Sequence, residues 1–403
     1  MRSEGKYPRR IQLEPMVHFR KSRGMSLGLV NSQGEEWHRF RSLLSKKMLR
    51  PKEIEQYNPQ INTVSKDLVE RLGVVKADNS HIQGVELEIF KWALESVGTI
   101  LFEERIGCFD EVPSTEAREF IGHVLGYFRT MQSLLFGPPL YKIRPTKEWL
   151  THCEHGDKVF ELGKAFVQKR VDALSRSSEA QTTSKQSSLL THMLAASELS
   201  RDEVVHTLVD LMQGAIETTS NTVLWTLYQL ATHPTAQEKL YNEVMNVVGE
   251  HGDVTTDALA KNAVRQSLSE ETFRKFPVTF ATSRIIPRDI EMGGYTIPKG
   301  SHVQASLYSM GRDPKLFNDP ETYNPDRWLG MHNDEVSKLP SLAFGHGARM
   351  CIGRRIAEQE IYTGISQIVR KYKLEYDGPE VKPTLQLVMT PDKPIVMKFV
   401  PRR

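Results

Sequence analysis

The chain has 403 residues, of which 39% are hydrophobic and 26% charged, which is enough for a sizeable core and unlike a disordered or fibrous protein. A net charge of +3 is too small to indicate nucleic-acid binding through bulk charge, and three cysteines exclude a disulfide framework. No apolar run reaches the roughly 18 residues of a transmembrane helix.

The N-terminal segment is basic. Its cations are Arg2, Lys6, Arg9, Arg10, Arg20, Lys21 and Arg23. Such a run is typical of organelle transit peptides, but Glu4, Glu14, Pro8 and Pro15 interrupt the acid-free amphipathic helix that such a peptide forms. We therefore expect no cleavable presequence in this segment.

Apolar residues then recur at helical spacing in several segments, each of which predicts a helix. These segments are residues 37–49, 61–72, 87–102, 119–135 and 158–174. A polar stretch rich in Ser, Thr and Gln follows at residues 175–188. This composition predicts an exposed loop between helices rather than a domain boundary.

The longest predicted helix begins at Ser200 and ends at His233-Pro234. Ser200 and Glu203 have the spacing of a capping box, in which each side chain satisfies a backbone N–H of the other. About 33 residues at 1.5 Å each give roughly 50 Å, enough to cross a whole domain. Its apolar residues lie on most sides, so we expect this helix to be buried at the centre of the protein.

The last third of the sequence is mixed. Strand-like runs occur at residues 282–286, 302–307 and 395–400, and a meander rich in Pro and Gly occupies residues 311–347. A further helix is expected after Cys351, ending near Tyr372. The predicted fold class is therefore mainly α with a minor β part, in one domain that spans residues 1–403.

The strongest chemical signal is the segment from Phe344 to Gly353, which reads Phe-Gly-His-Gly-Ala-Arg-Met-Cys-Ile-Gly. Its glycines allow the backbone to approach a flat ligand closely. Cys351 precedes a predicted helix, whose N-terminal dipole favours a thiolate, and a thiolate is a soft ligand for iron. Cys108 and Cys153 have no such context and are expected to be buried free thiols.

This segment resembles the haem-ligand loop of the cytochrome P450 family. The resemblance implies a P450-like single domain in which haem lies between the long central helix and the Cys loop, with Cys351 as the axial iron ligand. Arg349 is expected to meet a haem propionate, and Phe344 and Gly353 to contact the haem. The implied activity is that of a monooxygenase.

Two further segments resemble motifs of this family in the family's order. Glu271-Thr272-Phe273-Arg274 is similar to ExxR, and residues 320–328 are similar to PxxFxPxRW, with Tyr323 in place of Phe. The resemblance implies a buried ion-pair triad of Glu271, Arg274 and Arg327 that holds the Cys loop. Read alone, ExxR is also a common surface pair on a helix.

The long helix contains Gly214-Ala215-Ile216-Glu217-Thr218-Thr219, which resembles the family's oxygen-activation motif, with Ala215 in place of the second glycine. The resemblance implies that Thr218 supplies a catalytic hydroxyl, freed by a local opening of the helix, and that Glu217 is the adjacent acid. The alternative is that Thr218 bonds back to the carbonyl four residues earlier, as a threonine within a helix commonly does.

Two more positions match propionate-binding residues of the family. Trp37 and Arg41 have the spacing of its WxxxR motif and share one helix face, and Arg284 matches a strand arginine. With Arg349, these four residues would neutralise the two haem carboxylates. The alternative for Trp37 and Arg41 is a surface cation–π pair.

Several segments resemble the mitochondrial, ferredoxin-reduced branch of the family, namely residues 36–42, 91–96, 136–142 and 353–358. The resemblance implies O2 and a hydrophobic, sterol-like or lipid substrate, and a [2Fe–2S] ferredoxin as electron donor. It also implies that the protein resides on the matrix side of the mitochondrial inner membrane. Peripheral association with this membrane is compatible with the sequence. No nucleic-acid partner is expected.

The resemblance also places the surfaces that meet substrate and donor. The substrate pocket is expected near residues 128–135, 278–281 and 386–389. An acidic ferredoxin would dock on a basic face, for which the candidates are Arg354, Arg355, Arg370, Lys371 and Lys373. The alternative for these five cations is an ordinary solvated charge run.

The sequence departs from this branch in two ways. Gln266 and Glu270 stand where the branch has lysines, unless a one-residue insertion moves Arg265 into a basic place. The resemblance also implies that the first part of the family domain is absent before Met1. The second reading is therefore a truncated, non-catalytic chain that binds haem weakly or not at all.

Overall fold

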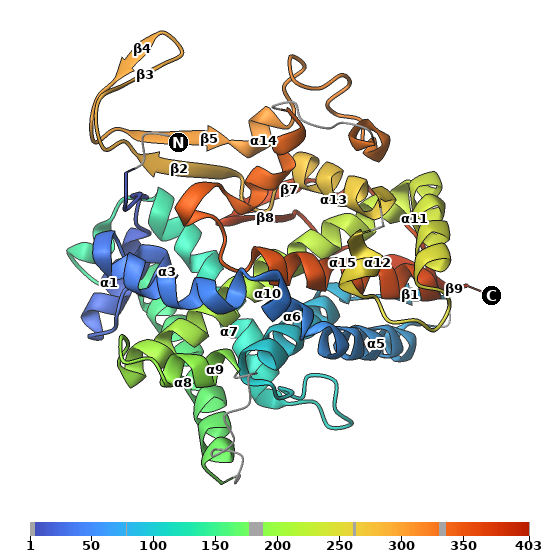
Figure 1. Ribbon diagram of the computed structural model, residues 1–403, viewed down its shortest axis with the longest axis horizontal. Coiled ribbons are helices and arrows are strands. Elements are labelled where there is room, and N and C mark those ends of the chain that lie inside the picture. The colour runs from blue at the N-terminus through green and yellow to red at the C-terminus, as the bar shows by residue number, and fades with distance from the viewer. Residues whose placement is uncertain (1–4, 78, 177–187, 261–262, 330–335, 403) are drawn as a thin grey trace.

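The computed structural model describes residues 5–77, 79–176, 188–260, 263–329 and 336–402 (Figure 1). These residues form a mainly helical protein with small antiparallel sheets, as predicted. The helices are α1 (Glu14–Ser22), α2 (Gly28–Asn31), α3 (Gly34–Met48), α4 (Pro51–Glu55), α5 (Asn58–Val75), α6 (Val85–Phe102), α7 (Thr115–Phe136), α8 (Lys147–Arg176), α9 (Leu189–Leu194), α10 (Arg201–Thr232), α11 (Pro234–Val247), α12 (Thr256–Ala260), α13 (Ala263–Lys275), α14 (Leu307–Met310) and α15 (Arg354–Lys371).

The strands pair in four sheets whose neighbours run antiparallel. One sheet has the order β1-β9-β6 and joins β1 (His81–Ile82), β9 (Met397–Pro401) and β6 (Tyr372–Glu375). The two-stranded sheets pair β2 (Ala281–Ile285) with β5 (His302–Ser306), β3 (Ile290–Met292) with β4 (Tyr295–Ile297), and β7 (Pro383–Gln386) with β8 (Val388–Pro391). Figure 1 shows β2 to β5 at one edge of the molecule, away from α5 and α8.

The long helix α10 organises the core. Its capping box is present, because Ser200 accepts from the backbone of Glu203 while Glu203 accepts from the backbone of Ser200. The first half of α10 packs in one large hydrophobic cluster and residues 223–231 pack in the other. The segment between them carries the predicted oxygen-activation motif, so this motif lies where the two clusters adjoin.

The helices and strands predicted from apolar spacing are present, and the five early helices are longer than predicted. The five early helices correspond to α3, α5, α6, α7 and α8, the helix after Cys351 is α15, and the three strands are β2, β5 and β9. The described part of the meander contains four short 3-10 helices, η3 (Pro325–Trp328), η4 (Val336–Lys338), η5 (Pro340–Phe344) and, at its end, η6 (Gly347–Arg349). Most of the predicted loop at 175–188 lies outside the described residues, but Arg176 ends α8 and Ser188 caps α9.

The sequence interpretation missed α1. The sequence pattern predicts that Glu14 and Pro15 interrupt a helix, but they occupy the first turn of α1. Proline favours this position because its missing N–H would have no helical partner there, and an acidic residue stabilises the positive end of the helix dipole. Of the described helices, none is both long and apolar enough to cross a membrane.

Candidate active site

The loop that carries Cys351 is closed by backbone hydrogen bonds. The Cys351 N–H donates to the Phe344 carbonyl at 2.7 Å, and the Met350 N–H donates to the Gly347 carbonyl at 3.0 Å. Gly345 and Gly347 have φ of 75° and 72°, a conformation that residues with a side chain adopt only at a cost. The turn therefore depends on these glycines, and residues 346–348 are left exposed.

The thiol of Cys351 lies at an accessible surface although protein surrounds it. Its residue is exposed, yet burial raises the pKa of the thiol, against the opposing effects of the Gly353 backbone N–H, Arg41 and Arg10. A residue can be both accessible and largely surrounded by protein when it lines the wall of an enclosed space. In the protein alone, burial therefore outweighs the effect of the helix terminus, which favours the thiolate. A cation next to the sulfur would lower the pKa of the thiol again.

Arginine side chains converge beside this loop. Arg349 is buried, and its pKa is lowered to about 9 by burial and by the positive charges of Arg10, Arg284 and Arg41. Within the described residues, neither Arg41 nor Arg349 forms an ion pair with a carboxylate. This surplus of positive charge, next to a recessed thiol, suits a ligand with carboxylate groups.

The side chains of this group also fix the loop. Arg41 donates to the Met350 carbonyl at 2.7 Å, and Arg284 donates to the His346 carbonyl at 2.5 Å. Trp37 is buried, and the Arg349 guanidinium lies 4.1 Å from the centre of its ring. The predicted set of Trp37, Arg41, Arg284 and Arg349 is thus brought together, with Trp37 stacked on Arg349 rather than forming a surface pair with Arg41.

Arg10 is a member of this cluster that the sequence interpretation did not single out. Its guanidinium donates to the backbone carbonyl of Arg349, and its charge lowers the pKa of that residue. In the sequence Arg10 was one of seven cations in a basic segment, and no pattern separates it from Arg9. Arg9 is exposed and instead bridges to Ile285 through its backbone.

Helix α10 presents an open stripe in an otherwise buried stretch. Gly214 is exposed and Ala215 and Thr218 are half-buried, while the adjoining Gln213, Ile216, Glu217 and Thr219 are buried. Thr218 lies four residues after Gly214 and three after Ala215, and both spacings place residues on one face of a helix. A side-chain carbon built on Gly214 would meet nothing within 4 Å. The stripe therefore borders free space at the middle of the longest helix.

The Thr218 hydroxyl bonds back to its own helix, and the local opening of the helix that the family motif implies is not seen. Its hydroxyl donates to the Gly214 carbonyl at 2.6 Å, and α10 is continuous from Arg201 to Thr232. Alanine at position 215 favours the helix by about 1 kcal/mol over glycine, which accounts for the regular backbone. With its proton committed, the Thr218 oxygen can accept a hydrogen bond from a group in the free space.

Glu217 is a buried acid next to this hydroxyl. Burial raises its pKa to about 8, the charge of Arg129 opposes this only in part, and Oε2 has no hydrogen-bond partner among the described residues. At neutral pH the carboxyl therefore carries a proton. A buried acid that holds its proton near its working pH has the property of a proton donor.

Glu271, Arg274 and Arg327 meet as predicted. Arg274 donates to both carboxylate oxygens of Glu271, at 2.7 and 2.8 Å, and Arg327 donates to one of them at 3.1 Å. The Asn324 backbone and the Trp328 indole donate to the same carboxylate at 2.8 and 2.9 Å. Phe273, between the motif residues, packs edge-on against Phe344 with 5.2 Å between ring centres, so the triad adjoins the Cys loop.

The segments predicted to surround the substrate are also joined. Gln132 of α7 donates to the Leu385 carbonyl of β7 at 2.6 Å, and the Met389 N–H of β8 donates to the Val278 carbonyl at 2.8 Å. Leu387, at the turn between β7 and β8, packs against the same hydrophobic cluster as the first half of α10.

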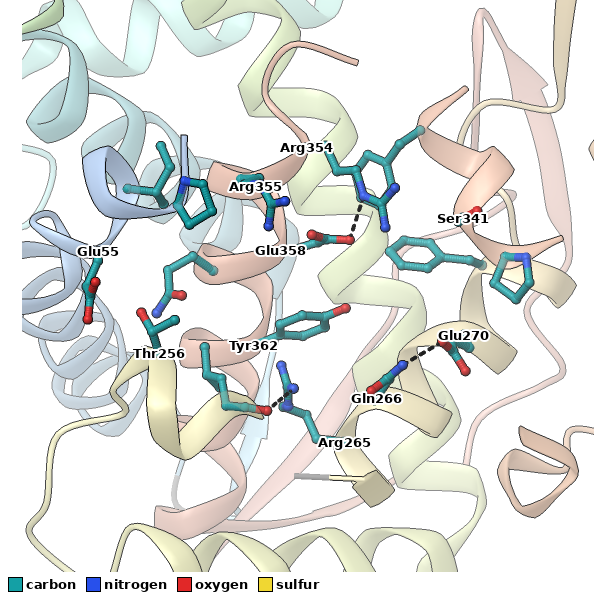
Figure 2. A pocket seen from close by; sticks show the side chains of 17 residues that line it. Glu55, Thr256, Arg265, Gln266, Glu270, Ser341, Arg354, Arg355, Glu358 and Tyr362 are labelled. Atoms are coloured by element: carbon teal, nitrogen blue, oxygen red, sulfur yellow. Dashed lines mark hydrogen bonds and ion pairs between the residues drawn. The ribbon is translucent and has the colours of Figure 1, made fainter. Parts of the chain in front are cut away.

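A groove of about 410 Å³ lies next to the Cys loop, between α4, α12, α13, η5 and α15 (Figure 2). Arg354 pairs with Glu358 at 2.9 Å, and Gln266 donates to Glu270 at 2.9 Å, as the dashed lines in Figure 2 show. Arg355 is exposed at the rim and donates to the Leu49 carbonyl. The groove thus joins cationic and acidic side chains next to the iron-ligand loop.

One expectation about the basic docking face needs correction. Arg265 does not supply a surface cation, because it is 6% exposed, its guanidinium lies 3.9 Å from the centre of the Tyr362 ring, and it donates to the Leu259 carbonyl. The five cations of α15 and β6 are spread along the helix, since about 24 Å of helix separates Arg354 from Arg370. Arg370 is held by the carbonyls of Gly249 and Gly252.

The other two cysteines are buried free thiols, as predicted. No group of three or more metal-ligating side chains occurs in the described part of the chain. A single recessed thiol, arginines that converge beside it and an open helix face fit an iron porphyrin with two carboxylates and do not fit an ion held by protein side chains alone. The fold and this site define a haem-thiolate oxidoreductase.

Comparison with known proteins agrees. The family model described as Cytochrome P450 matches residues 1–399, and the chain belongs to this family, whose members hold haem iron through a cysteine thiolate and act as monooxygenases. It is 41% identical to Cytochrome P450 10 of Lymnaea stagnalis, over 100% of the chain and 74% of that protein. It is 32% identical to Cytochrome P450 27C1 of Danio rerio and to the mitochondrial sterol 26-hydroxylase of Rattus norvegicus, over 100% of the chain and 76% and 78% of those proteins.

Proposed function

We propose that this chain binds haem through the Cys351 thiolate and inserts one oxygen atom of O2 into a hydrophobic, sterol-like or lipid substrate. The observation that carries the proposal is the recessed Cys351 thiol beside four converging arginines, Arg10, Arg41, Arg284 and Arg349. The relatives support the substrate class, because they include a sterol 26-hydroxylase and a cholesterol side-chain cleavage enzyme.

Each predicted site residue has its own role in this proposal. Arg41, Arg284, Arg349 and Trp37 would hold the haem carboxylates, and Phe344 and Gly353 flank Cys351. When bound, the haem would supply the iron that activates O2, with electron density donated by the Cys351 sulfur. Thr218 would accept a hydrogen bond from a group in the free space beside α10, and Glu217 would be a proton source because its pKa is about 8.

The electron donor is a [2Fe–2S] ferredoxin in this proposal, and it docks on the groove of Figure 2. Support comes from the mitochondrial relatives and from Arg355, a cation exposed at the rim. Charge reversal of Arg355 should raise the ferredoxin concentration needed for half-maximal reduction. The same reversal at Lys371, an exposed cation at the far end of α15, should leave it unchanged.

The site of action in this proposal is the mitochondrion, on the matrix side of the inner membrane. The names of several relatives state a mitochondrial enzyme. Fractionation of mitochondria from a cell that expresses the full-length protein, with protease protection before and after rupture of the inner membrane, tests this placement. Digestion in intact mitochondria would contradict it.

The thiolate is tested by the difference spectrum of the dithionite-reduced protein with and without CO. Wild type should show a strongly red-shifted Soret band, and Cys351→Ala should lose it. Cys108→Ala and Cys153→Ala are the matched controls, because both thiols are buried and free, and they should retain the band.

Absence of the shifted band in wild type, or its persistence in Cys351→Ala, would overturn the haem-thiolate assignment. The truncated, non-catalytic reading would then take its place. If the band is present, consumption of O2 with a ferredoxin and its reductase, coupled to hydroxylation of a sterol, tests the monooxygenase assignment separately.

A further inference from the structure

Two histidines face each other across the helix pair α7 and α8, outside the candidate active site. Nδ1 of His123 lies 3.0 Å from Nδ1 of His155, with 5.2 Å between ring centres and 60° between ring planes. Both residues are half-buried, so solvent reaches them. Helix α7 also carries Gln132, which contacts β7 beside the predicted substrate segments.

The backbone of α7 makes room for this arrangement. A side-chain carbon built on Gly126 would lie 2.4 Å from Cε1 and 2.7 Å from Nδ1 of His155. Any residue larger than glycine would displace the imidazole from its place opposite His123. Gly122, one turn earlier on the same helix, has nothing within 4 Å of its built carbon, so close packing is particular to position 126.

The spacing of the two nitrogens is that of two ligands of one metal ion. Metal–imidazole bonds of about 2.0–2.1 Å place a single ion on both nitrogens with an angle of about 95° between the bonds. This angle is near the 90° of octahedral and tetragonal sites and smaller than the tetrahedral angle preferred by structural zinc. Ni²⁺ and Cu²⁺ are the ions that favour such geometry with nitrogen ligands.

We propose that His123 and His155 form a two-histidine site for a divalent transition metal ion that bridges α7 and α8, with water as the remaining ligands. Burial lowers the pKa of His155, His123 and Arg129 lower it further, and Glu154 opposes them, so this imidazole is neutral, the form that binds metal, at physiological pH. The bound ion ties together the helix pair that borders the predicted substrate segments.

The test uses tag-free holoprotein and Ni²⁺ as the probe, because Ni²⁺ is not reduced by the free thiols as Cu²⁺ is. Equilibrium dialysis should find one Ni²⁺ per chain, with a dissociation constant raised at least tenfold by His123→Ala and by His155→Ala. His251→Ala should leave it unchanged, since that imidazole is almost fully exposed and far along the chain. Ni-edge X-ray absorption, which does not detect the haem iron, should show two imidazole ligands.

A second pair of variants keeps both histidines. Gly126→Ala should weaken Ni²⁺ binding by displacing the His155 ring, whereas Gly122→Ala should not. The reduced CO spectrum of each variant reports whether the haem site is still assembled. Absence of Ni²⁺ binding in wild type, or equal binding in wild type and both histidine variants, would overturn the site and leave an N–H···N hydrogen bond between the two imidazoles.

Discussion

Replacement of Glu271 by glutamine should destabilise the protein more than any single change at its surface. The carboxylate is fully buried and accepts five hydrogen bonds, three of them from the guanidinium groups of Arg274 and Arg327. Glutamine has nearly the same volume but no charge, and its amide nitrogen cannot accept. Loss of one member of a buried charge pair costs about 3–5 kcal/mol, because the remaining charge is left without a partner.

The assay is urea unfolding of the holoprotein, followed by tryptophan fluorescence and by haem absorbance in parallel. Glu271→Gln should lower the free energy of unfolding by about 3–5 kcal/mol, and Glu271→Ala by at least as much. The control is Glu161→Gln, because Glu161 pairs with Lys158 while both are half exposed, and it should change stability by less than about 1 kcal/mol. Equal midpoints for Glu271→Gln and wild type would refute the argument that this carboxylate holds the Cys loop.

Two further predictions concern α10. Thr218→Val should retain haem and the reduced CO spectrum but lower product formed per O2 consumed by at least about tenfold, because the hydrogen-bond acceptor on the open stripe is lost; an unchanged ratio would remove Thr218 from the proposed chemistry. Glu217 has its pKa raised to about 8 in the folded protein, against an ordinary value of 4.5 for a glutamate. Between these two pH values the folded form holds more protons than the unfolded chain, so stability is lost as the pH rises through that range. Relative to wild type, Glu217→Gln should therefore gain up to about 1.4 kcal/mol per pH unit over this range, measured by urea unfolding at a series of pH values, and a pH-independent difference would contradict the assignment. Glu360→Gln should show the same pH dependence without loss of activity, because Glu360 is buried with a pKa of about 8 but is no part of the proposed chemistry.

Local patterns in the sequence were sufficient for the frame of the site. The capping box of Ser200 and Glu203 located the start of α10, and the order of ExxR, the arginine-tryptophan segment and the Cys loop brought Glu271 and Arg327 together correctly. These features depend on neighbouring residues or on motifs whose order is characteristic. Local patterns are therefore enough to predict the loop that carries Cys351, and the residues that support it, one by one.

Contacts between distant segments could not be read in this way. Arg10 reaches the Cys loop because Arg9 bridges to Ile285 and the Arg349 side chain donates to the Pro8 carbonyl, contacts that span more than 270 residues of sequence. The cations of α15 are far apart because the helix is long. Arg265 points inward because its guanidinium stacks on the Tyr362 ring. A motif also does not show whether the Thr218 hydroxyl is free. In the structure the hydroxyl donates to the Gly214 carbonyl, within a helix that carries alanine rather than glycine at position 215.

The arginine cluster makes a final prediction about how haem and stability are linked. Burial lowers the folded pKa of Arg349 to about 9, together with repulsion from Arg10, Arg284 and Arg41, so the destabilisation is fully present at neutral pH and is relieved only as the pH rises above 9. The repulsive part responds to other charges. Two haem carboxylates would relieve it at neutral pH, and so would screening by salt. Added NaCl should therefore raise the unfolding temperature of the haem-free protein more than that of the holoprotein. The same comparison in Arg349→Met should show a smaller difference, because one of the four charges is gone. An equal salt response of both forms in wild type would mean that the cluster is neutralised by other means and that its convergence does not serve to bind the haem carboxylates.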